Sequence, residues 1–459
     1  MKLLPAFTKR LSRIAKNKEI LNKILFTALM ILIYRIMSGV PLPGVNPAAF
    51  RQVFGDNPFN NVFTIISGGR LDQPSLVAIG VAPFINASII IQLLTTVIPR
   101  LEDLNKQGEI GRRTLNQYTR LLTIPLSIVQ SIMIYSILIN PSFVGGVAGA
   151  NNLLKPLHGG PLVALILTLA AGSILLMWIG ELITENGIGN GASVIIAFGI
   201  ISSLPRLILG EINGLNSDWQ SVLSGNYRAL FSNSFLLFYL VIFIIIVMIF
   251  LIIYVSEAVR KIAVMYAKRV RVGNSAESYL PIKLNQAGVM PVIFAQALLT
   301  FPQIISSFVL SIKSAGRLHD WATLVSNWEI LKITSISHVI AFILLIIAFT
   351  YFYTYVVVKP EELAKNLQKS GAFIPGVRPG NGTVSYLNSV TLKLTMFGAV
   401  FLAIIAIIPS LLNIFEGSQR FTILSGIGGT SLLIVVGVFM DSYRKMQSLK
   451  SVQSYESFR

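Results

Sequence analysis

The chain has 459 residues, and only 12% of them are charged, about half the share that is usual in soluble domains. Hydrophobic residues make up 54%, in long uncharged stretches without the strict alternation of barrel strands. This excludes a soluble globular protein and predicts an all-α polytopic membrane protein. The absence of cysteine excludes disulfides and thiolate chemistry, and three scattered histidines give no metal-binding spacing.

The N-terminal segment, residues 1–22, is basic, and its leucine and isoleucine residues recur at helical spacing. This pattern predicts a helix that lies on the anionic cytoplasmic surface of a membrane. The first span that follows has no convincing small-residue cleavage site, so we predict no cleavable signal.

The next apolar element is broken. A short apolar piece at 62–66 is followed by Ser67-Gly68-Gly69-Arg70-Leu71-Asp72-Gln73-Pro74, which interrupts any helix. The longer piece at 80–98 carries Pro83 and Asn86, and a charged hairpin follows it. Irregular backbone at membrane depth is tolerated where it lines a cavity or packs on protein. Two interpretations stay open: a kinked helix in a bundle, or a pore-lining helix preceded by a short re-entrant one.

Hydropathy along the chain predicts ten transmembrane helices, of which the second is the broken element. They are expected at about 23–40, 62–98, 118–140, 161–183, 192–209, 234–255, 287–310, 333–358, 389–408 and 421–440.

The distribution of basic residues orients these spans. The two termini and the loops on their side hold 27 of the 37 lysines and arginines, and the opposite loops hold 9. By the positive-inside rule, both termini are expected in the cytoplasm.

Five spans fall in residues 1–212 and five in residues 213–459, so the two halves would enter the membrane in opposite orientations. That arrangement is typical of inverted repeats, in which the transport path lies between the halves. The sequence shows no convincing internal repeat, so the symmetry rests on the count alone.

Two cytoplasmic segments, 256–286 and 359–388, are longer than connectors need to be. In the first, apolar residues alternate with basic ones, which predicts a hairpin. The second predicts a short helix closed by Ser370-Gly371, and then a Pro/Gly turn that presents Arg378. Both are either ordinary positive-inside loops or a docking surface for an acidic partner.

Several long motifs closely resemble the bacterial SecY family, the central channel of the Sec protein translocon, and they are collinear from the first span to the tail. They are SGG (67–69), ASIIIQLL (87–94), GRR…NQYTR (111–120), MWIGELITENGIGNG (177–191), MYAKR (265–269), LPIKLNQAGVMP (280–291), KSGAFIPGVRPG (369–380) and GGTSLLIVVGVFMD (428–441).

The resemblance implies two inverted five-helix halves around a central gated pore that is sealed by an aliphatic ring. The matching ring positions are Val81, Ile85, Ala192, Ile196, Ile293 and Ile434. An apolar collar excludes ions by dewetting. Ala192 and Val81 are smaller than the family's usual isoleucines, so either the collar is looser or another side chain fills the gap.

The resemblance also implies a plug and a lateral gate. The plug is expected near 61–73, with Val62, Phe63, Ile66, Ser67, Gly68 and Gly69. The gate is expected to carry Asn86, Gln130 and Asn285, whose amides can hydrogen-bond one another at about 1 kcal/mol or less per bond in a membrane.

The implied function is translocation of unfolded secretory polypeptides across the bacterial cytoplasmic membrane, with lateral release of membrane segments. The implied partners are SecE, SecG, the ATPase SecA, the ribosome, signal peptides, preproteins and lipid. No cofactor is implied. The residues expected to dock SecA or the ribosome are Arg260, Lys261, Lys268, Arg269, Arg271 and Arg378.

Alternatives remain in other classes. The chain has no phosphate-binding loop, no GxSxG and no HExxH motif, and neither Glu181 nor Glu185 has an evident acid/base partner, so we expect no enzyme. A secondary transporter also uses inverted halves and broken helices, but midplane carboxylates for ion coupling are scarce here. A structural membrane scaffold is the third possibility.

Overall fold

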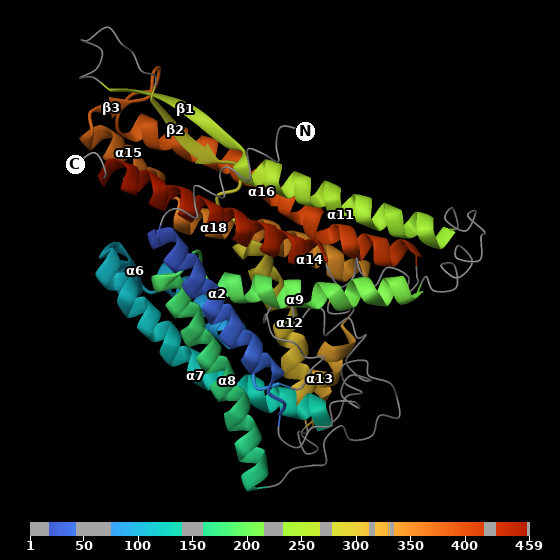
Figure 1. The fold of residues 1–459 in the computed structure, drawn as a ribbon. Helices are drawn as coiled ribbons and strands as arrows, with labels where there is room; N and C mark the ends of the chain where they lie inside the picture. The colour runs from blue at the N-terminus through green and yellow to red at the C-terminus, as the bar shows by residue number, and fades with distance from the viewer. Residues whose placement is uncertain are drawn as a thin grey trace.

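A computed structural model describes residues 18–42, 75–139, 159–214, 233–266, 278–311, 317–328, 330, 335–416 and 428–456. The chain is mostly helical (Figure 1). The first half contains α2 (Lys18–Gly39), α5 (Ala82–Val97), α6 (Pro99–Lys106), α7 (Glu109–Ile139), α8 (Gly160–Asn186) and α9 (Gly191–Gly214). The second half contains α11 (Asn233–Glu257), α12 (Met290–Ser311), α13 (Arg317–Asn327), α14 (Ile336–Val357), α15 (Pro360–Lys369), α16 (Asn381–Glu416) and α18 (Gly429–Glu456).

Each of the ten predicted spans overlaps one of these helices. By length and composition, and within the described residues, five helices can cross a membrane. The pair α5 and α6, bent by 101°, makes a sixth if it is counted as one broken span. Helices α9 and α12 contain shorter apolar stretches. An all-α polytopic membrane fold is therefore confirmed, while the count of ten spans stays a prediction.

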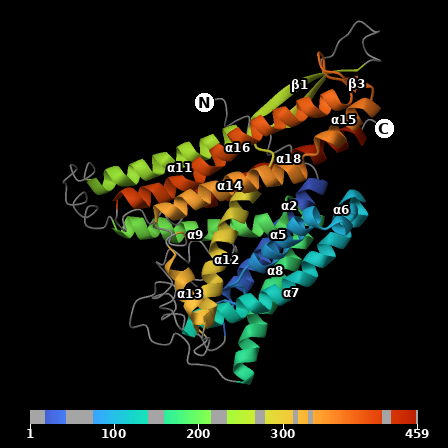
Figure 2. The same ribbon diagram turned by 180° about the vertical axis from the view of Figure 1, so that it is seen from behind.

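The helices pack in two groups (Figures 1 and 2). Helices α5, α7 and α8 lie against one another, and α2 packs on α8. Helices α11, α14, α16 and α18 form the other group, with α16 between α14 and α18. Two further helices connect the groups: α9 packs against both α8 and α18, and α12 packs against both α7 and α14.

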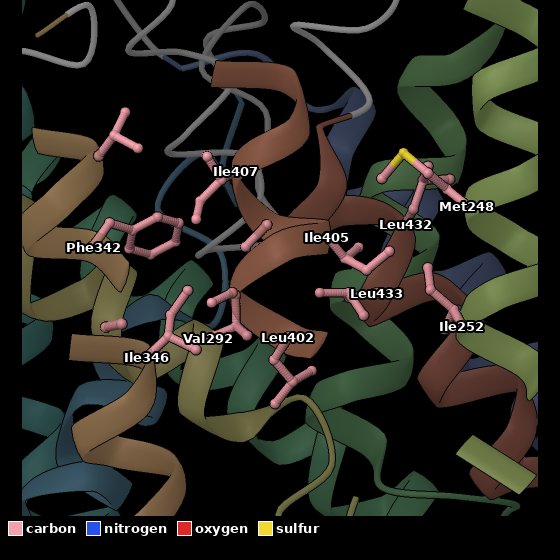
Figure 3. Close-up of a cluster of buried hydrophobic side chains, with 14 of the residues drawn as sticks. Met248, Ile252, Val292, Phe342, Ile346, Leu402, Ile405, Ile407, Leu432 and Leu433 are labelled. Atoms are coloured by element: carbon pink, nitrogen blue, oxygen red, sulfur yellow. The ribbon is translucent and has the colours of Figure 1, made fainter. Parts of the chain in front are cut away.

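The second group is held by an apolar core, which we call the C-terminal cluster (Figure 3). It joins Met248 of α11, Val292 of α12, Ile346 of α14 and Leu402 of α16, with Leu433 of α18 completing it. All five are buried, so this half has its own core in addition to the contacts that it makes with α7 and α9.

The two long polar segments form one folded unit. Strand β1 (Val259–Tyr266) pairs antiparallel with β2 (Ser278–Lys283), which confirms the predicted hairpin. The other edge of β1 pairs with β3 (Ala372–Phe373) from the second segment, giving the strand order β2-β1-β3. The predicted short helix is α15, and Ser370 is its C-cap.

Two features differ from the expectations. Helices α7, α16 and α18 extend well beyond the predicted spans into polar sequence. Helix α13 lies between two predicted spans, where no helix was expected. The plug, at about 61–73, lies outside the described residues, as do Lys268, Arg269 and Arg271.

Candidate functional site

The chain enters the bundle just before α5 in a non-helical conformation. Residues 75–81 form consecutive turns, and Leu76 donates its amide to the Val40 carbonyl (2.9 Å). Val77 and Ile79 in this segment are fully buried. Gly172 of α8 makes this possible, because a Cβ there would lie only 2.0 Å from the Leu76 carbonyl oxygen. Irregular backbone is thus packed against protein, as the membrane interior requires.

Five of the six predicted ring residues belong to one buried apolar group, which we call the central cluster. Val81 and Ile85 come from the start of α5, Ile196 from α9, Ile293 from α12 and Ile434 from α18. Each is at most 7% exposed. The cluster therefore lies where helices of both halves converge.

Ala192 is not a member of the central cluster. It lies at the first turn of α9, where its backbone nitrogen approaches Gly180 of α8. The cluster instead includes residues that the sequence did not single out, namely Tyr34, Val77, Leu176, Ile179, Ile183, Ile195 and Ile200. The wall opposite the second half is thus supplied by α2, α8 and α9 together.

The predicted gate amides Asn86, Gln130 and Asn285 lie on α5, on α7 and in the turn before α12, and we call the contact between α7 and α12 the seam. Among the described residues, no hydrogen bond joins any two of these amides. Asn285, in the turn before α12, donates from Nδ2 to the Gly288 carbonyl (3.1 Å). The side-chain oxygens of Gln130, Asn285 and Gln286 are buried without a hydrogen-bond partner. A buried acceptor left unpaired costs about 1–3 kcal/mol, so this seam is imperfectly satisfied.

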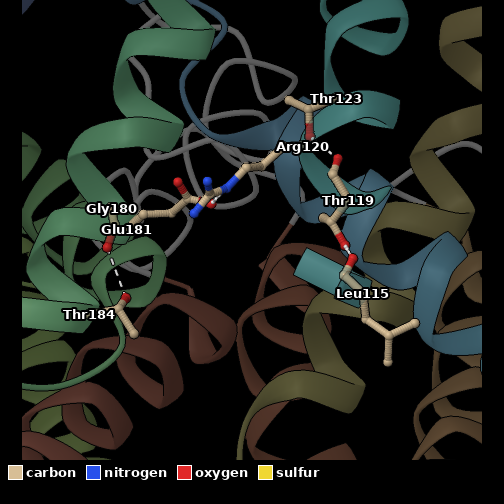
Figure 4. Close-up of polar contacts among 7 residues, drawn as sticks. All are labelled: Leu115, Thr119, Arg120, Thr123, Gly180, Glu181 and Thr184. Carbon is tan, nitrogen blue, oxygen red and sulfur yellow. Dashed lines mark hydrogen bonds and ion pairs between the residues drawn. The ribbon is translucent and has the colours of Figure 1, made fainter. Parts of the chain in front are cut away.

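Elsewhere on α7 the buried hydroxyls are satisfied locally (Figure 4). Thr119 donates to the Leu115 carbonyl (3.0 Å) and Thr123 to the Thr119 carbonyl (2.7 Å). Ser131 does the same with the Ser127 carbonyl. The Gln130 side-chain oxygen thus differs from these hydroxyls in having no hydrogen-bond partner.

One ion pair joins α7 to α8. Arg120 Nε lies 2.5 Å from Glu181 Oε1, and Figure 4 shows the two side chains extended toward each other. The Glu181 side chain is only 16% exposed. No partner for this carboxylate could be identified from local sequence, because Arg120 is 61 residues away along the chain. An ion-paired glutamate of this kind holds two helices together and is not a free base.

The turn between α8 and α9 is held from three sides. Thr27 of α2 accepts the Ile188 amide (3.1 Å), and Thr184 accepts the Gly191 amide (2.8 Å). From α18, Lys445 donates to the carbonyls of Thr184 (3.4 Å) and Gly189 (3.3 Å). Partial burial lowers the pKa of the Lys445 ammonium, and the charge of Lys23 lowers it further. This contact ties the C-terminal helix to the first half.

The folded unit of β1, β2, β3 and α15 presents three of the six predicted docking residues on its surface. Arg260 and Lys261 are exposed on β1, and the Lys261 ammonium lies 5.9 Å from the centre of the Tyr279 ring. Arg378 is exposed in the turn between Gly376 and Gly380. Beneath them Ile262, Ile282, Ala364, Ile374 and Leu387 form one small core. The basic side chains therefore stand on a folded platform.

Within the described residues, no group of three His, Asp or Glu side chains is arranged to hold a metal ion. In this described part of the chain, the clusters noted above are apolar, amide-bearing or basic. Such groups exclude ions, adjust to moving surfaces or attract acidic partners, and none of them supplies a nucleophile with a base.

Comparisons with known proteins agree on one family. A family model described as SecY matches residues 75–443. The chain is 38% identical over 450 residues to the protein translocase subunit SecY of Staphylococcus aureus strain NCTC 8325 / PS 47, covering 96% of this chain and 97% of that protein. It is 40% identical over 455 residues to the same subunit of Aquifex aeolicus strain VF5, with the same coverage.

Two solved structures share the fold. One is described as the structure of a protein conducting channel, with a TM-score of 0.63, 18% identity, and coverage of 95% of this chain and 94% of that one. The other is Sec61 in the canine ribosome-channel complex from the endoplasmic reticulum, with a TM-score of 0.61, 18% identity and the same coverage.

Proposed function

This chain belongs to the SecY family, and we propose that it is a protein-conducting channel whose pore is closed by the central cluster. The family is one of translocon channel subunits and not of enzymes. The observation that carries the proposal is that Ile85, Ile196, Ile293 and Ile434, with Val81, are drawn from four helices of both halves into one buried group.

The chemistry of this cluster suits a seal. Its members are aliphatic, apart from Tyr34, and a narrow aliphatic waist expels water and so blocks ions. Flexible aliphatic side chains can also mould around a moving peptide. Because Ala192 is small and stands outside the cluster, we propose that Ile195 and Ile200 of α9 fill the space that a sixth ring isoleucine would take.

The seam between α7 and α12 is the proposed lateral gate, formed by α5 and α7 on one side and α12 and α14 on the other. The unpaired oxygens of Gln130 and Asn285 support this, because a seam with unsatisfied acceptors is less stable when closed. A signal peptide would open it, and membrane segments would leave through it. The segment at about 61–73 is the proposed plug, on the strength of the family resemblance.

The remaining proposals concern topology and partners. Ten spans in two inverted halves, 1–212 and 213–459, would place both termini in the cytoplasm of a bacterial cell. The platform that bears Arg260, Lys261 and Arg378 would then face the cytoplasm and receive SecA or a ribosome. SecE and SecG would complete the complex in the membrane.

A transport assay tests the channel directly. The purified chain with SecE and SecG in lipid vesicles, supplied with SecA and ATP, should carry a secretory precursor to a protease-protected interior. The same vesicles should take up no small solute in exchange for a proton or sodium gradient. Protection of the precursor supports the channel; solute uptake without precursor transport would identify a secondary transporter instead.

A further inference from the structure

Helix α13, Arg317–Asn327, lies between α12 and α14 in the chain and packs against α12 in space (Figures 1 and 2). It has no part in the central cluster, the seam or the cytoplasmic platform. Its sequence, RLHDWATLVSN, mixes apolar and polar residues, so it is an amphipathic helix rather than a span.

Only part of the apolar surface of α13 is covered. Ala322 and Val325 are buried, at 0% and 6% exposure. Trp321, Leu324 and the following Trp328 are 45%, 69% and 59% exposed. Trp321 and Leu324 are three residues apart and lie on one side of α13, and Trp328 directly follows the last residue of the helix. The helix thus contacts α12 with one part of its apolar side and leaves two indoles and a leucine uncovered.

The two helices that flank α13 in the chain also expose apolar side chains. Helix α14 begins at Ile336 and is apolar enough to span a membrane, and its Ile336, Ile340 and Leu344 are exposed. On α12, Leu298 and Phe301 are exposed as well. A short helix that follows one such helix and precedes the other must lie near the membrane boundary at which they are connected.

We propose that α13 inserts Trp321, Leu324 and Trp328 into the headgroup–acyl boundary of a phospholipid bilayer. Indole suits this boundary because its ring is apolar while its N–H can donate to a headgroup or to water. Thr323 lies on the other side of α13 and remains in water, while exposed Asp320, four residues before Leu324, lies at the edge of the inserted face, at headgroup level. The inference rests on the membrane placement of α12 and α14 that the proposed function assumes, and it assigns α13 as the element that fixes α12 at the bilayer surface.

Tryptophan fluorescence tests this, because the chain has four tryptophans. The double variant Trp178→Phe, Trp219→Phe keeps only the two indoles of this face. The full-length variant is reconstituted in vesicles of phosphatidylcholine that is brominated either near the glycerol end of the acyl chain or near its terminal methyl. We expect the shallow bromines to quench about twofold more than the deep ones, since interfacial indoles lie at headgroup level.

The matched control keeps only Trp178, which is exposed in the apolar stretch of α8 and should respond at least as strongly to the deep bromines. Stronger quenching of the α13 indoles by deep bromines would overturn the proposal, as would quenching by aqueous iodide alone. If neither the shallow bromines, nor the deep bromines, nor iodide quenched the two indoles, the proposal would also be overturned, because the indoles would then be covered by protein. Precursor transport in the same vesicles is scored separately, so a failed channel assay with intact shallow quenching leaves the interfacial assignment standing.

Discussion

Lys445 Nζ of α18 lies 3.3 Å from the carbonyl oxygen of Gly189, so the last helix of the chain supports the turn that joins α8 to α9. Gly189 adopts a φ of +91°, a conformation that side chains disfavour, and a Cβ there would lie 2.8 Å from Ser442 Oγ. The turn is therefore shaped to receive α18, and the two halves are joined at this point by polar contacts as well as by apolar packing.

Replacing Lys445 with Met should lower the free energy of unfolding by about 1 kcal/mol, because the two carbonyls lose their donor. Lys445→Arg, which keeps the charge and several donors, should lose less. Thermal unfolding in detergent measures both. Because burial lowers the pKa of Lys445 below 10.5, raising the pH toward that value should stabilise the parent relative to the Met variant. A pH-independent difference would contradict the burial of this ammonium.

Replacing Ile85, Ile196 and Ile293 together with Ser should raise the ion conductance of the resting channel by about an order of magnitude or more, because hydroxyls remove the dewetting barrier. Planar bilayer recording measures the leak. The matched control is Val292, Ile346 and Leu402, all to Ser, in the C-terminal cluster. Val292 is the immediate neighbour of Ile293 on α12, so the control tests the same helix. Equal leak from both triples would mean that lost packing, and not a lost seal, is responsible.

Replacing Gln130 with Leu should stabilise the closed seam by about 1–3 kcal/mol, because it removes a buried acceptor that has no partner. Export of precursors with weakened signal sequences should therefore fall, while export with a strong signal should change little. Val129→Leu adds apolar volume on the exposed side of the same helix and is the control. If the Gln130 variant exported precursors with weakened signal sequences as well as the parent does, Gln130 would not be a gate residue.

Replacing Arg378 with Glu should abolish SecA-driven translocation and leave membrane insertion of the chain intact, because the side chain is exposed and the platform core does not include it. Lys365→Glu makes the same change of charge on the exposed side of α15. Translocation by reconstituted vesicles and direct binding of SecA are the measurements. An equal loss in both variants would indicate that overall charge, rather than the position of Arg378, governs docking.

The sequence predicted best what depends on local composition. The predicted spans at 161–183 and 234–255 lie within α8 (Gly160–Asn186) and α11 (Asn233–Glu257) and end within a few residues of their limits, because both are unbroken apolar runs. Helix α16 starts at Asn381 rather than near 389, because its first two turns are polar and hydropathy cannot mark a helix that leaves the membrane.

The sequence predicted least well what depends on distant pairs. Nothing local in Ala372–Phe373 indicates that it completes a sheet with Met265 and Tyr266, and nothing near Glu181 indicates Arg120 as its partner. The gate positions came from the family resemblance. It assigns Asn285 to the gate but does not reveal that Asn285 Nδ2 donates a hydrogen bond to the Gly288 carbonyl. The ring as a working seal stays a prediction, although five of its six members are buried together.

The β2-β1-β3 sheet has a mechanical consequence. Strand β2 is joined to α12 by the short segment 284–289, while α14 leads almost directly into α15, which packs beside β3. A partner that binds the sheet therefore contacts the unit to which the ends of both α12 and α14 are connected. A displacement of the sheet would move both helix ends together. Such coupled movement needs no hinge within either helix, because the strand hydrogen bonds and the small core around Ile262 and Ile374 transmit the displacement.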